Sequence, residues 1–367
     1  MTLGPIVALI VHRLGFKLST TLGALVCASA MAGCLLFQDF ISFKIFYGFI
    51  MGVGAALLYV PGNTCSSFYF AKRQALALGI VAAGASIGIM VFPLVFSFVY
   101  QHFHKEGIYI FNIVACLSLI PLVLAFYPSA NEVKERTEHF VQSKNGRRLS
   151  AISVISRPDK SSSVKMGIKK QLTALLEVKV MAYMLAVFFQ GAGHVTLSLL
   201  IPKISHEVLD VPNHMNSLLL TLVGAAGIPS RILVGWLADK SWVNPLFLFL
   251  MGTAGSSICC FVYPFVHAYW LMVLTVIAQA VVWALYCSTF MVCPLTLVGL
   301  KKFNFVSGVV YGFYGVGAIL APPAIGHLYE NVLGHNIFGI MCVTGAIYGA
   351  GTIFSLISLL CHRSQSK

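Results

Sequence analysis

The residue with the clearest chemical potential is Arg231, which lies deep inside a stretch that otherwise holds no charged side chain. A charged residue at the centre of a membrane helix costs about 2.5 kcal/mol or more, and it is tolerated where it faces a water-filled cavity or a partner. The planar guanidinium suits bidentate binding of a carboxylate. The pattern therefore predicts an anion-binding role. The alternative is a side chain that reaches along its helix toward Asp239, two turns further on.

His194 is the second candidate, because it follows three small residues in the middle of another apolar stretch. An imidazole, with an ordinary pKa of about 6.5, is able to carry a proton or to bond a substrate. Gln190 stands four residues earlier and therefore shares a face of the same helix. The alternative is a neutral histidine that bonds a neighbouring helix.

Membrane-spanning helices must position these residues. Of the 367 residues, 58% are apolar and 10% are charged, whereas a soluble chain is about 25% charged. So few charges do not cover the surface of a water-soluble protein. Stretches free of Asp, Glu, Lys and Arg predict ten complete spans of a ~30 Å core, with a turn near Pro264 and His267 that divides the longest stretch. These stretches are 18–38, 45–71, 74–104, 107–131, 180–202, 211–230, 241–300, 303–329 and 331–362.

The positions of the basic residues predict the orientation. The net charge is +13, but 20 of the 24 Lys and Arg residues fall on one set of alternating loops and on the C-terminal tail. Only Lys44, Lys105 and Lys203 fall on the other set, and Arg231 lies within a span. Basic loops stay on the cytoplasmic side of a membrane, so this charge indicates topology and no nucleic-acid partner. We expect a multi-pass protein of the plasma membrane whose linker and C-terminus are cytoplasmic.

Residues 132–179 divide the chain into two parts. This basic, Ser-rich stretch is typical of a disordered cytoplasmic linker. The eleven mostly apolar residues before His12 would cross only about half of the membrane core, so we expect a truncated chain that lacks one helix and half of the next. The predicted organisation is a partial N-terminal transmembrane half (1–131), the linker (132–179), a six-helix half (180–361) and a tail (362–367).

An internal repeat predicts how the two halves are related. At a fixed offset of 229 residues, five residues of one segment match five of another: Lys72, Arg73, Gly79, Gly88 and Pro93 correspond to Lys301, Lys302, Gly308, Gly317 and Pro322. A weaker match at an offset of 227 pairs Ala8, His12 and Arg13 with Gly235, Asp239 and Lys240. Two parallel six-helix halves are the plan of major facilitator transporters. The predicted fold class is therefore an all-α membrane protein with this fold.

The sequence offers no support for enzymatic or metal chemistry. It lacks a G-x-x-x-x-G-K-[ST] phosphate loop, an H-E-x-x-H motif and an acidic cluster. Its ten cysteines include no C-x-x-C pair, so neither a zinc site nor a disulfide framework is predicted. We expect no enzyme activity, no cofactor and no bound metal.

Residues 69–77, which read Tyr-Phe-Ala-Lys-Arg-Gln-Ala-Leu-Ala and lead into a glycine-rich helix, resemble the signature of the monocarboxylate transporter family. The resemblance extends along essentially the whole chain, including Pro229-Ser230-Arg231 and the segment from Pro322 to Leu328. The family's second signature, an acidic-Gly-Gly-Trp-Gly-Trp segment, belongs to a first helix that this sequence does not contain.

The resemblance implies roles for individual residues. Arg231 stands where the family binds the carboxylate of its substrate, and the stretch with Gln190 and His194 is implied to line the cavity. A later helix would add an aromatic wall and a small polar residue, and an earlier helix a further aromatic contact, through Trp283, Cys287, Ser288 and Tyr59. For these four residues, packing against lipid or neighbouring helices is the open alternative.

One position departs from the family pattern. Proton-coupled members carry an aspartate one turn before the arginine, where this sequence has Gly227. The lysine that those members carry in the first helix is absent as well. Because a proton-coupled cycle needs a titratable group beside the substrate, we expect weak coupling to protons.

The basic pairs of the repeat suit a gate at the cytoplasmic entrance. Basic residues in the cytoplasmic turns of this fold latch the gate against acids and helix ends, and the alternative is that they only set the topology. The expected gating and signature residues are Tyr69, Phe70, Lys72, Arg73, Gly79, Gly88, Asp239, Lys301 and Lys302.

These observations predict a secondary transporter that moves a small monocarboxylate or related organic acid by alternating access. One alternative is a facilitative carrier of amino-acid-like or zwitterionic substrates without proton coupling, and another is an inert truncated product. The expected partners are the small organic acid and the lipid bilayer. For some family members the resemblance also implies a single-span ancillary protein of the immunoglobulin type.

Overall fold

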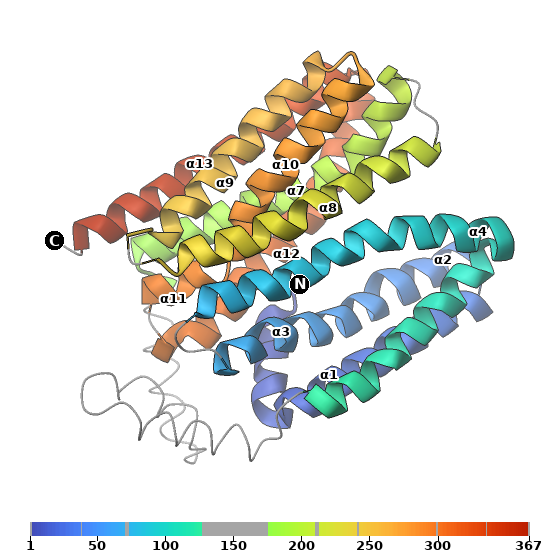
Figure 1. Cartoon of the computed structure of the whole chain (residues 1–367), viewed down its shortest axis with the longest axis horizontal. Helices are drawn as coiled ribbons and strands as arrows, with labels where there is room; N and C mark the ends of the chain where they lie inside the picture. The colour runs from blue at the N-terminus through green and yellow to red at the C-terminus, as the bar shows by residue number, and fades with distance from the viewer. Residues whose placement is uncertain are drawn as a thin grey trace.

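The computed structural model describes residues 2–37, 39–69, 73–126, 175–209, 213–240, 242–298, 300–334 and 336–365, and these are helical throughout apart from short turns (Figure 1). Helix α1 (Gly4–Leu36) contains Gly15 at a φ of 78°, where the helix changes direction. Glycine adopts this left-handed conformation without the steric cost that a side chain would add. The helix α2 (Phe40–Phe43), the π-helical turn η1 (Lys44–Ile50) and α3 (Met51–Tyr69) follow as one continuous helical stretch.

Helix α4 (Gln74–Phe126) is folded back on itself at His104, whose φ is 53° and ψ −158° (Figure 1). At 1.5 Å per residue, 53 residues would extend about 80 Å, more than twice the ~30 Å hydrocarbon core. The element therefore supplies two crossings. They correspond to the spans that the sequence predicts at 74–104 and 107–131.

The C-terminal half contains the helices α7 (Val178–Leu209), α8 (Asn213–Ala238), α9 (Pro245–Val262), α10 (Tyr269–Thr289), α11 (Val292–Val298), α12 (Leu300–Asn331) and α13 (Ile337–Gln365). The predicted turn between two spans is confirmed by the 3₁₀ turn η2 (Tyr263–Phe265), which separates α9 from α10. The short helix α11 was not predicted. Over the whole described part of the chain, nine helical stretches are long and apolar enough to cross a membrane, and one of them is the folded-back α4.

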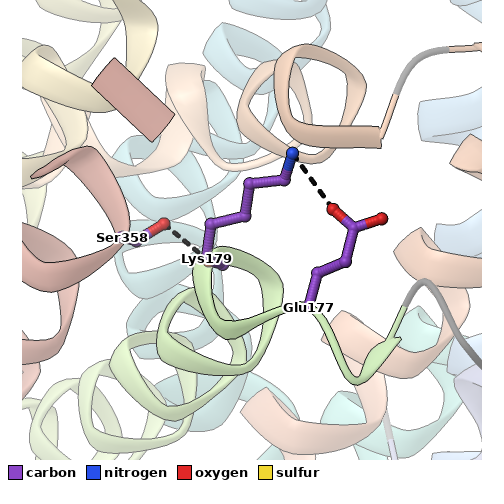
Figure 2. A network of polar contacts seen from close by, with 3 residues as sticks. All are labelled: Glu177, Lys179 and Ser358. Carbon is purple, nitrogen blue, oxygen red and sulfur yellow. Dashed lines mark hydrogen bonds and ion pairs between the residues drawn. The ribbon is translucent and has the colours of Figure 1, made fainter. Parts of the chain in front are cut away.

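Hydrogen bonds between helices tie the C-terminal half together. The Tyr183 hydroxyl of α7 donates to the Phe290 carbonyl oxygen at 2.8 Å, next to the C-terminal end of α10. The Ser257 hydroxyl of α9 donates to the Gly345 carbonyl oxygen of α13, also at 2.8 Å. At the start of α7, the carbonyl oxygen of Lys179 accepts from the Ser358 hydroxyl at 2.7 Å, and its ammonium pairs with Glu177 at 3.0 Å (Figure 2). These bonds make the half a well-fixed scaffold.

The N-terminal half packs through smaller residues. Helix α1 contacts α3 and α4, and Gly23 of α1 lies against Gly54 and Leu57 of α3. Its buried apolar cluster consists of Cys27, Ala28 and Cys116. Small residues at such contacts allow helix backbones to approach closely in a membrane.

The two halves meet along two seams, which we name the α4–α8 seam and the α1–α12 seam. In the α4–α8 seam, a Cβ placed on Gly79 would lie 3.1 Å from the Cα atom of Gly235. In the α1–α12 seam, a Cβ placed on Gly4 would lie 2.7 Å from the carbonyl oxygen of Gly308. Gly79 and Gly308 are partners in the sequence repeat, so the repeat corresponds to an equivalent packing position in each half.

Candidate functional site

Arg231 lies in the interior of the bundle, where it is 3% exposed. Its Nη1 atom donates a hydrogen bond to the carbonyl oxygen of Ala82 in α4, across the α4–α8 seam. The guanidinium does not reach toward Asp239, whose carboxylate bonds elsewhere. The alternative that Arg231 extends along its own helix to the cytoplasmic end is therefore wrong.

An aromatic stack completes the surroundings of this charge. The guanidinium carbon of Arg231 lies 5.1 Å from the ring centroid of Trp283 in α10. The ring of His194 in α7 stacks on Trp283 with centroids 3.8 Å apart and an interplanar angle of 26°. The attraction of a cation to an indole face contributes about 0.5–2 kcal/mol. Three helices of the C-terminal half thus meet at one point and hold the arginine in place.

Several buried polar atoms around this stack have no hydrogen-bond partner among the described residues. They are Nε of Arg231, Nε1 of Trp283, both amide atoms of Gln190 and the hydroxyls of Tyr286 and Tyr348. Gln190 is fully buried. An unsatisfied buried polar group costs about 1–3 kcal/mol, and protein interiors rarely leave several together. A polar ligand that entered between the helices would supply hydrogen-bond partners for these atoms.

The other predicted contacts fall into two groups. In the first group, His194 stacks on Trp283 beside Arg231, and Cys287 stands one turn after Trp283 in α10. Tyr59 is 43% exposed and packs edge-on against Tyr311 at 5.7 Å between centroids. Ser288 is buried, and its hydroxyl donates to the main-chain carbonyl oxygen of Arg231 at 3.1 Å. Ser288 therefore braces the backbone that carries the arginine.

The structure explains why position 227 holds a glycine. A Cβ on Gly227 would lie 2.6 Å from the hydroxyl oxygen of Ser86 in α4. The seam leaves no space there for a carboxylate side chain unless Ser86 moves. None of the chain's Asp and Glu residues lies in the middle of a described membrane crossing, and Glu106 stands at the fold-back of α4, two residues after His104.

Asp239 lies just beyond the end of α8 and contacts the first turn of α4. Its Oδ1 accepts from the backbone N–H of Ala75 at 3.0 Å and its Oδ2 from that of Leu76 at 2.9 Å. A carboxylate is stabilised at a helix N-terminus, where backbone donors lack partners inside the helix. The predicted gating residue thus joins the two halves at one end of the molecule.

The remaining gating predictions are less fully placed. Arg73 is exposed at the start of α4. Phe70 and Lys72 lie outside the described residues, and so do the side chains of Tyr69, Lys301 and Lys302. Gly79 lies in the α4–α8 seam, and near Gly88 a Cβ would meet only the ring of Phe92 in its own helix.

Sequence reasoning missed four side chains near the site: Ser86, Tyr286, Tyr311 and Tyr348. Ser86 lies within the glycine-rich segment of the repeat, and Tyr311 lies in its second copy, so the repeat offered a signal for both. For the two other tyrosines the sequence contains no signal, because an aromatic residue in an apolar helix usually packs against its neighbours.

Residues 1–322 match the sequence profile of the Major Facilitator Superfamily, so this chain belongs to that superfamily of transporters. Its relatives within the superfamily are monocarboxylate transporters. Monocarboxylate transporter 12 of Mus musculus is 24% identical over 371 residues, which cover 98% of this chain and 74% of the relative. Monocarboxylate transporter 9 of Gallus gallus is 24% identical over 349 residues, which cover 77% of this chain and 68% of the relative.

Two solved structures share the fold. The human organic anion transporter MFSD10 (TETRAN) aligns with a TM-score of 0.67 at 10% identity, covering 96% of this chain and 80% of that one. A point variant of the Escherichia coli fucose:proton symporter FucP aligns with a TM-score of 0.66 at 14% identity, covering 97% of this chain and 87% of that one. The predicted all-α major facilitator fold is therefore confirmed, and nine helical stretches of the described residues that are long and apolar enough to cross a membrane agree with a multi-pass protein.

Proposed function

We propose that this chain is a secondary transporter that moves a small monocarboxylate across the membrane by alternating access. The observation that carries the proposal is the buried Arg231 guanidinium, which has a carbonyl oxygen and an aromatic face as neighbours. The one ion pair between described residues, Lys179 with Glu177, lies elsewhere. A buried cation without a counter-ion is costly. A substrate carboxylate would supply the missing negative charge and accept from Nε.

The orphaned polar atoms support a substrate with a further polar group. The Gln190 amide offers a donor and an acceptor, and the Trp283 indole N–H and two tyrosine hydroxyls offer donors. Zwitterionic substrates are the second candidate, and they would need a partner for their ammonium group. Since no Asp or Glu lies in the middle of a described membrane crossing, the site favours a carboxylate with an uncharged polar remainder.

Alternating access requires a contact that forms in one state and breaks in another. The Asp239 carboxylate on the first turn of α4 suits this role, because it joins the two halves only while the α4–α8 seam is closed at that end. From the positive-inside pattern we place this end in the cytoplasm, together with the C-terminus, in a plasma-membrane protein. An ancillary immunoglobulin-type partner stays a prediction of the family resemblance.

Uptake of radiolabelled small monocarboxylates by the purified chain in liposomes tests the proposal. Arg231→Ala should lower uptake by about 30- to 4000-fold, because truncating one partner of a buried charge pair costs about 2–5 kcal/mol. Arg231→Lys should restore only part of it, since an ammonium lacks the bidentate fork. Lys203→Gln is the matched control, because it removes a cation that lies over the Tyr329 ring.

All variants are compared by size-exclusion profile and thermal unfolding, so that a loss of uptake is assigned to the site and not to misfolding. Unchanged uptake in Arg231→Ala would remove the substrate role. Absence of uptake by the unmodified chain, for every monocarboxylate tried, would favour the inert product.

A further inference from the structure

A cavity lies in the N-terminal half, at the end where α4 folds back on itself. Its volume is about 260 Å³, and its walls come from the end of α1, from α2 and from the returning arm of α4. The lining residues are Cys34, Phe37, Phe40, Phe43, Lys105 and Tyr109. None of them belongs to the Arg231 site, which is built from α4, α7, α8 and α10. The cavity is therefore independent of the proposed substrate site.

The walls of this cavity are aromatic and lie near the protein surface. Four of the six lining side chains carry an aromatic ring. The rings of Phe37, Phe40 and Phe43 are partly exposed, whereas Cys34 is buried. Sites for small molecules are typically concave and apolar with few polar groups. Aromatic residues are common at the membrane interface, and here they also line a concave surface together with Lys105.

The positive charge at this cavity is unusual for its side of the membrane. Only three lysines stand on the non-cytoplasmic set of loops, and two of them are here. Lys105 lines the cavity, and the Lys44 ammonium lies 4.1 Å from the ring centroid of Phe40, another lining residue. Asp39 and Glu106 are near in sequence, yet neither forms an ion pair with these lysines among the described residues.

We propose that this cavity binds an amphipathic anion, a carboxylate or phosphate attached to an apolar body, at the extracytoplasmic end of the N-terminal half. Lys105 would hold the anionic group, because a lysine in partly apolar surroundings gains from a charge-assisted hydrogen bond. The rings of Phe37, Phe40 and Phe43 would enclose the apolar body. The depth is that of the membrane interface, where such molecules place their charged end in the headgroup layer.

Photolabelling of the full chain in phosphatidylcholine liposomes tests this site. One probe is an alkyl carboxylate with a diazirine in its chain, and the matched uncharged probe is the corresponding primary amide. Peptide mass spectrometry should find carboxylate adducts within 34–43 and 105–109, with few adducts from the amide. Lys105→Gln should lower this labelling by about tenfold, the loss expected for one hydrogen bond to a charged group.

Two controls keep the result independent of folding. Lys105→Arg retains the charge and should retain the labelling, and Lys203→Gln removes the third lysine of the same side without touching the cavity. Equal labelling by the carboxylate and the amide, or labelling that survives Lys105→Gln, would overturn the proposal. Adducts spread only over lipid-facing helices would overturn it as well.

A third probe identifies the source of the anion. Diazirine-bearing phosphatidylglycerol competes with the carboxylate probe if the natural occupant is a lipid headgroup. Competition by free alkyl or aryl carboxylates, but not by phosphatidylglycerol, assigns the cavity to soluble amphipathic acids. Competition by either kind of molecule supports an anion site. If neither kind competes with the carboxylate probe, the proposal is contradicted.

Discussion

The two seams between the halves are built alike but carry different chemistry. In each seam a glycine of one half lies against backbone of the other, Gly79 against Arg231 and Gly235, and Gly4 against Gly308. At the offset of 227 residues that relates the weaker repeat, Gly4 corresponds to Arg231. The α4–α8 seam thus has a guanidinium where the α1–α12 seam has no side chain at all.

The same asymmetry recurs at the end of the seams where α8 ends and α4 begins. Asp239 accepts two backbone hydrogen bonds from the first turn of α4, and the residue that matches it at the offset of 227 is His12. Close packing of small residues is therefore repeated in both halves, while the guanidinium of Arg231 and the carboxylate of Asp239, for which we propose binding and gating roles, are not repeated in the other seam. The repeated glycines pack the helices together, so Arg231 and Asp239, which are not repeated, are the residues to test.

Among the packing positions of the α4–α8 seam, the largest effect is expected from Gly79→Leu. A Cβ at this position would lie 2.7 Å from the carbonyl oxygen of Arg231, and backbone on both sides leaves little room to yield. Overpacking of this kind costs about 1–3 kcal/mol, so we expect uptake to fall by about 100-fold. The control is Gly84→Leu, since Gly84 has no atom within 4 Å of its Cβ position among the described residues.

Liposome uptake and thermal unfolding measure this difference. If Gly79→Leu transports as well as Gly84→Leu, the close seam is not needed in any state of the cycle. If both variants fail equally, the loss reflects helix propensity or insertion and not the seam.

A smaller effect is expected when the contact between Asp239 and the first turn of α4 is weakened. Asp239→Asn removes the charge that accepts from Ala75 and Leu76, and a charge at a helix N-terminus contributes about 0.3–2 kcal/mol. Amide hydrogen exchange in a peptide that covers residues 73–80 should accelerate by up to about 30-fold. Glu330→Gln, which removes an exposed acid near the end of α12, should leave that peptide unchanged.

Unaltered exchange in Asp239→Asn would show that the first turn of α4 is held by other contacts. Faster exchange combined with normal uptake would separate the latch from the transport cycle, and it would remove Asp239 from the proposed gate.

The sequence predicted the fold and the central charge because both depend on strong, local signals. In a membrane protein, apolar stretches of this length form membrane-spanning helices. A lone arginine inside such a helix indicates a functional site. The repeat predicted two related halves, and its positions Gly79 and Gly308 lie at equivalent contacts between them, whereas Gly88 contacts no other helix closely among the described residues. The short helix α11 was missed because seven residues between two spans carry no periodicity of their own.

The details of the site depend on packing between distant segments, which the sequence does not encode locally. Ser288 was predicted as a site residue, but its hydrogen bond to the Arg231 backbone was not. That bond depends on how α10 is rotated against α8. The cavity in the N-terminal half was not predicted either, because Cys34, Phe40 and Tyr109 come together only through the fold-back of α4. Arg231 could be predicted from its charge alone, whereas its partners Ala82 and Trp283 required a structure to identify the contact.

The smallest effect is expected from the proton gradient. The α4–α8 seam carries a cation but has Gly227, where proton-coupled relatives carry an acid, and no Asp or Glu lies in the middle of a described membrane crossing. With the internal pH clamped near 7.5, lowering the external pH from about 7.5 to about 6 should change uptake by less than about threefold, because only histidine titrates in this range without perturbation. His194→Ala tests whether any remaining dependence belongs to the imidazole that stacks on the Trp283 ring beside Arg231.

A converse variant sharpens this test. Gly227→Asp alone should fold poorly, because its Cβ would meet the Ser86 hydroxyl at 2.6 Å, so the double variant Gly227→Asp, Ser86→Gly provides the space. An acid one turn from Arg231 would bind a proton in competition with the guanidinium and would link uptake to external pH. We expect the double variant to gain a pH dependence that a protonophore abolishes, while Ser86→Gly alone does not. If uptake by the unmodified chain rises tenfold at pH 6 and a protonophore abolishes the rise, this seam couples protons without a carboxylate. If that rise persists in His194→Ala, the proton carrier lies outside the Arg231 site.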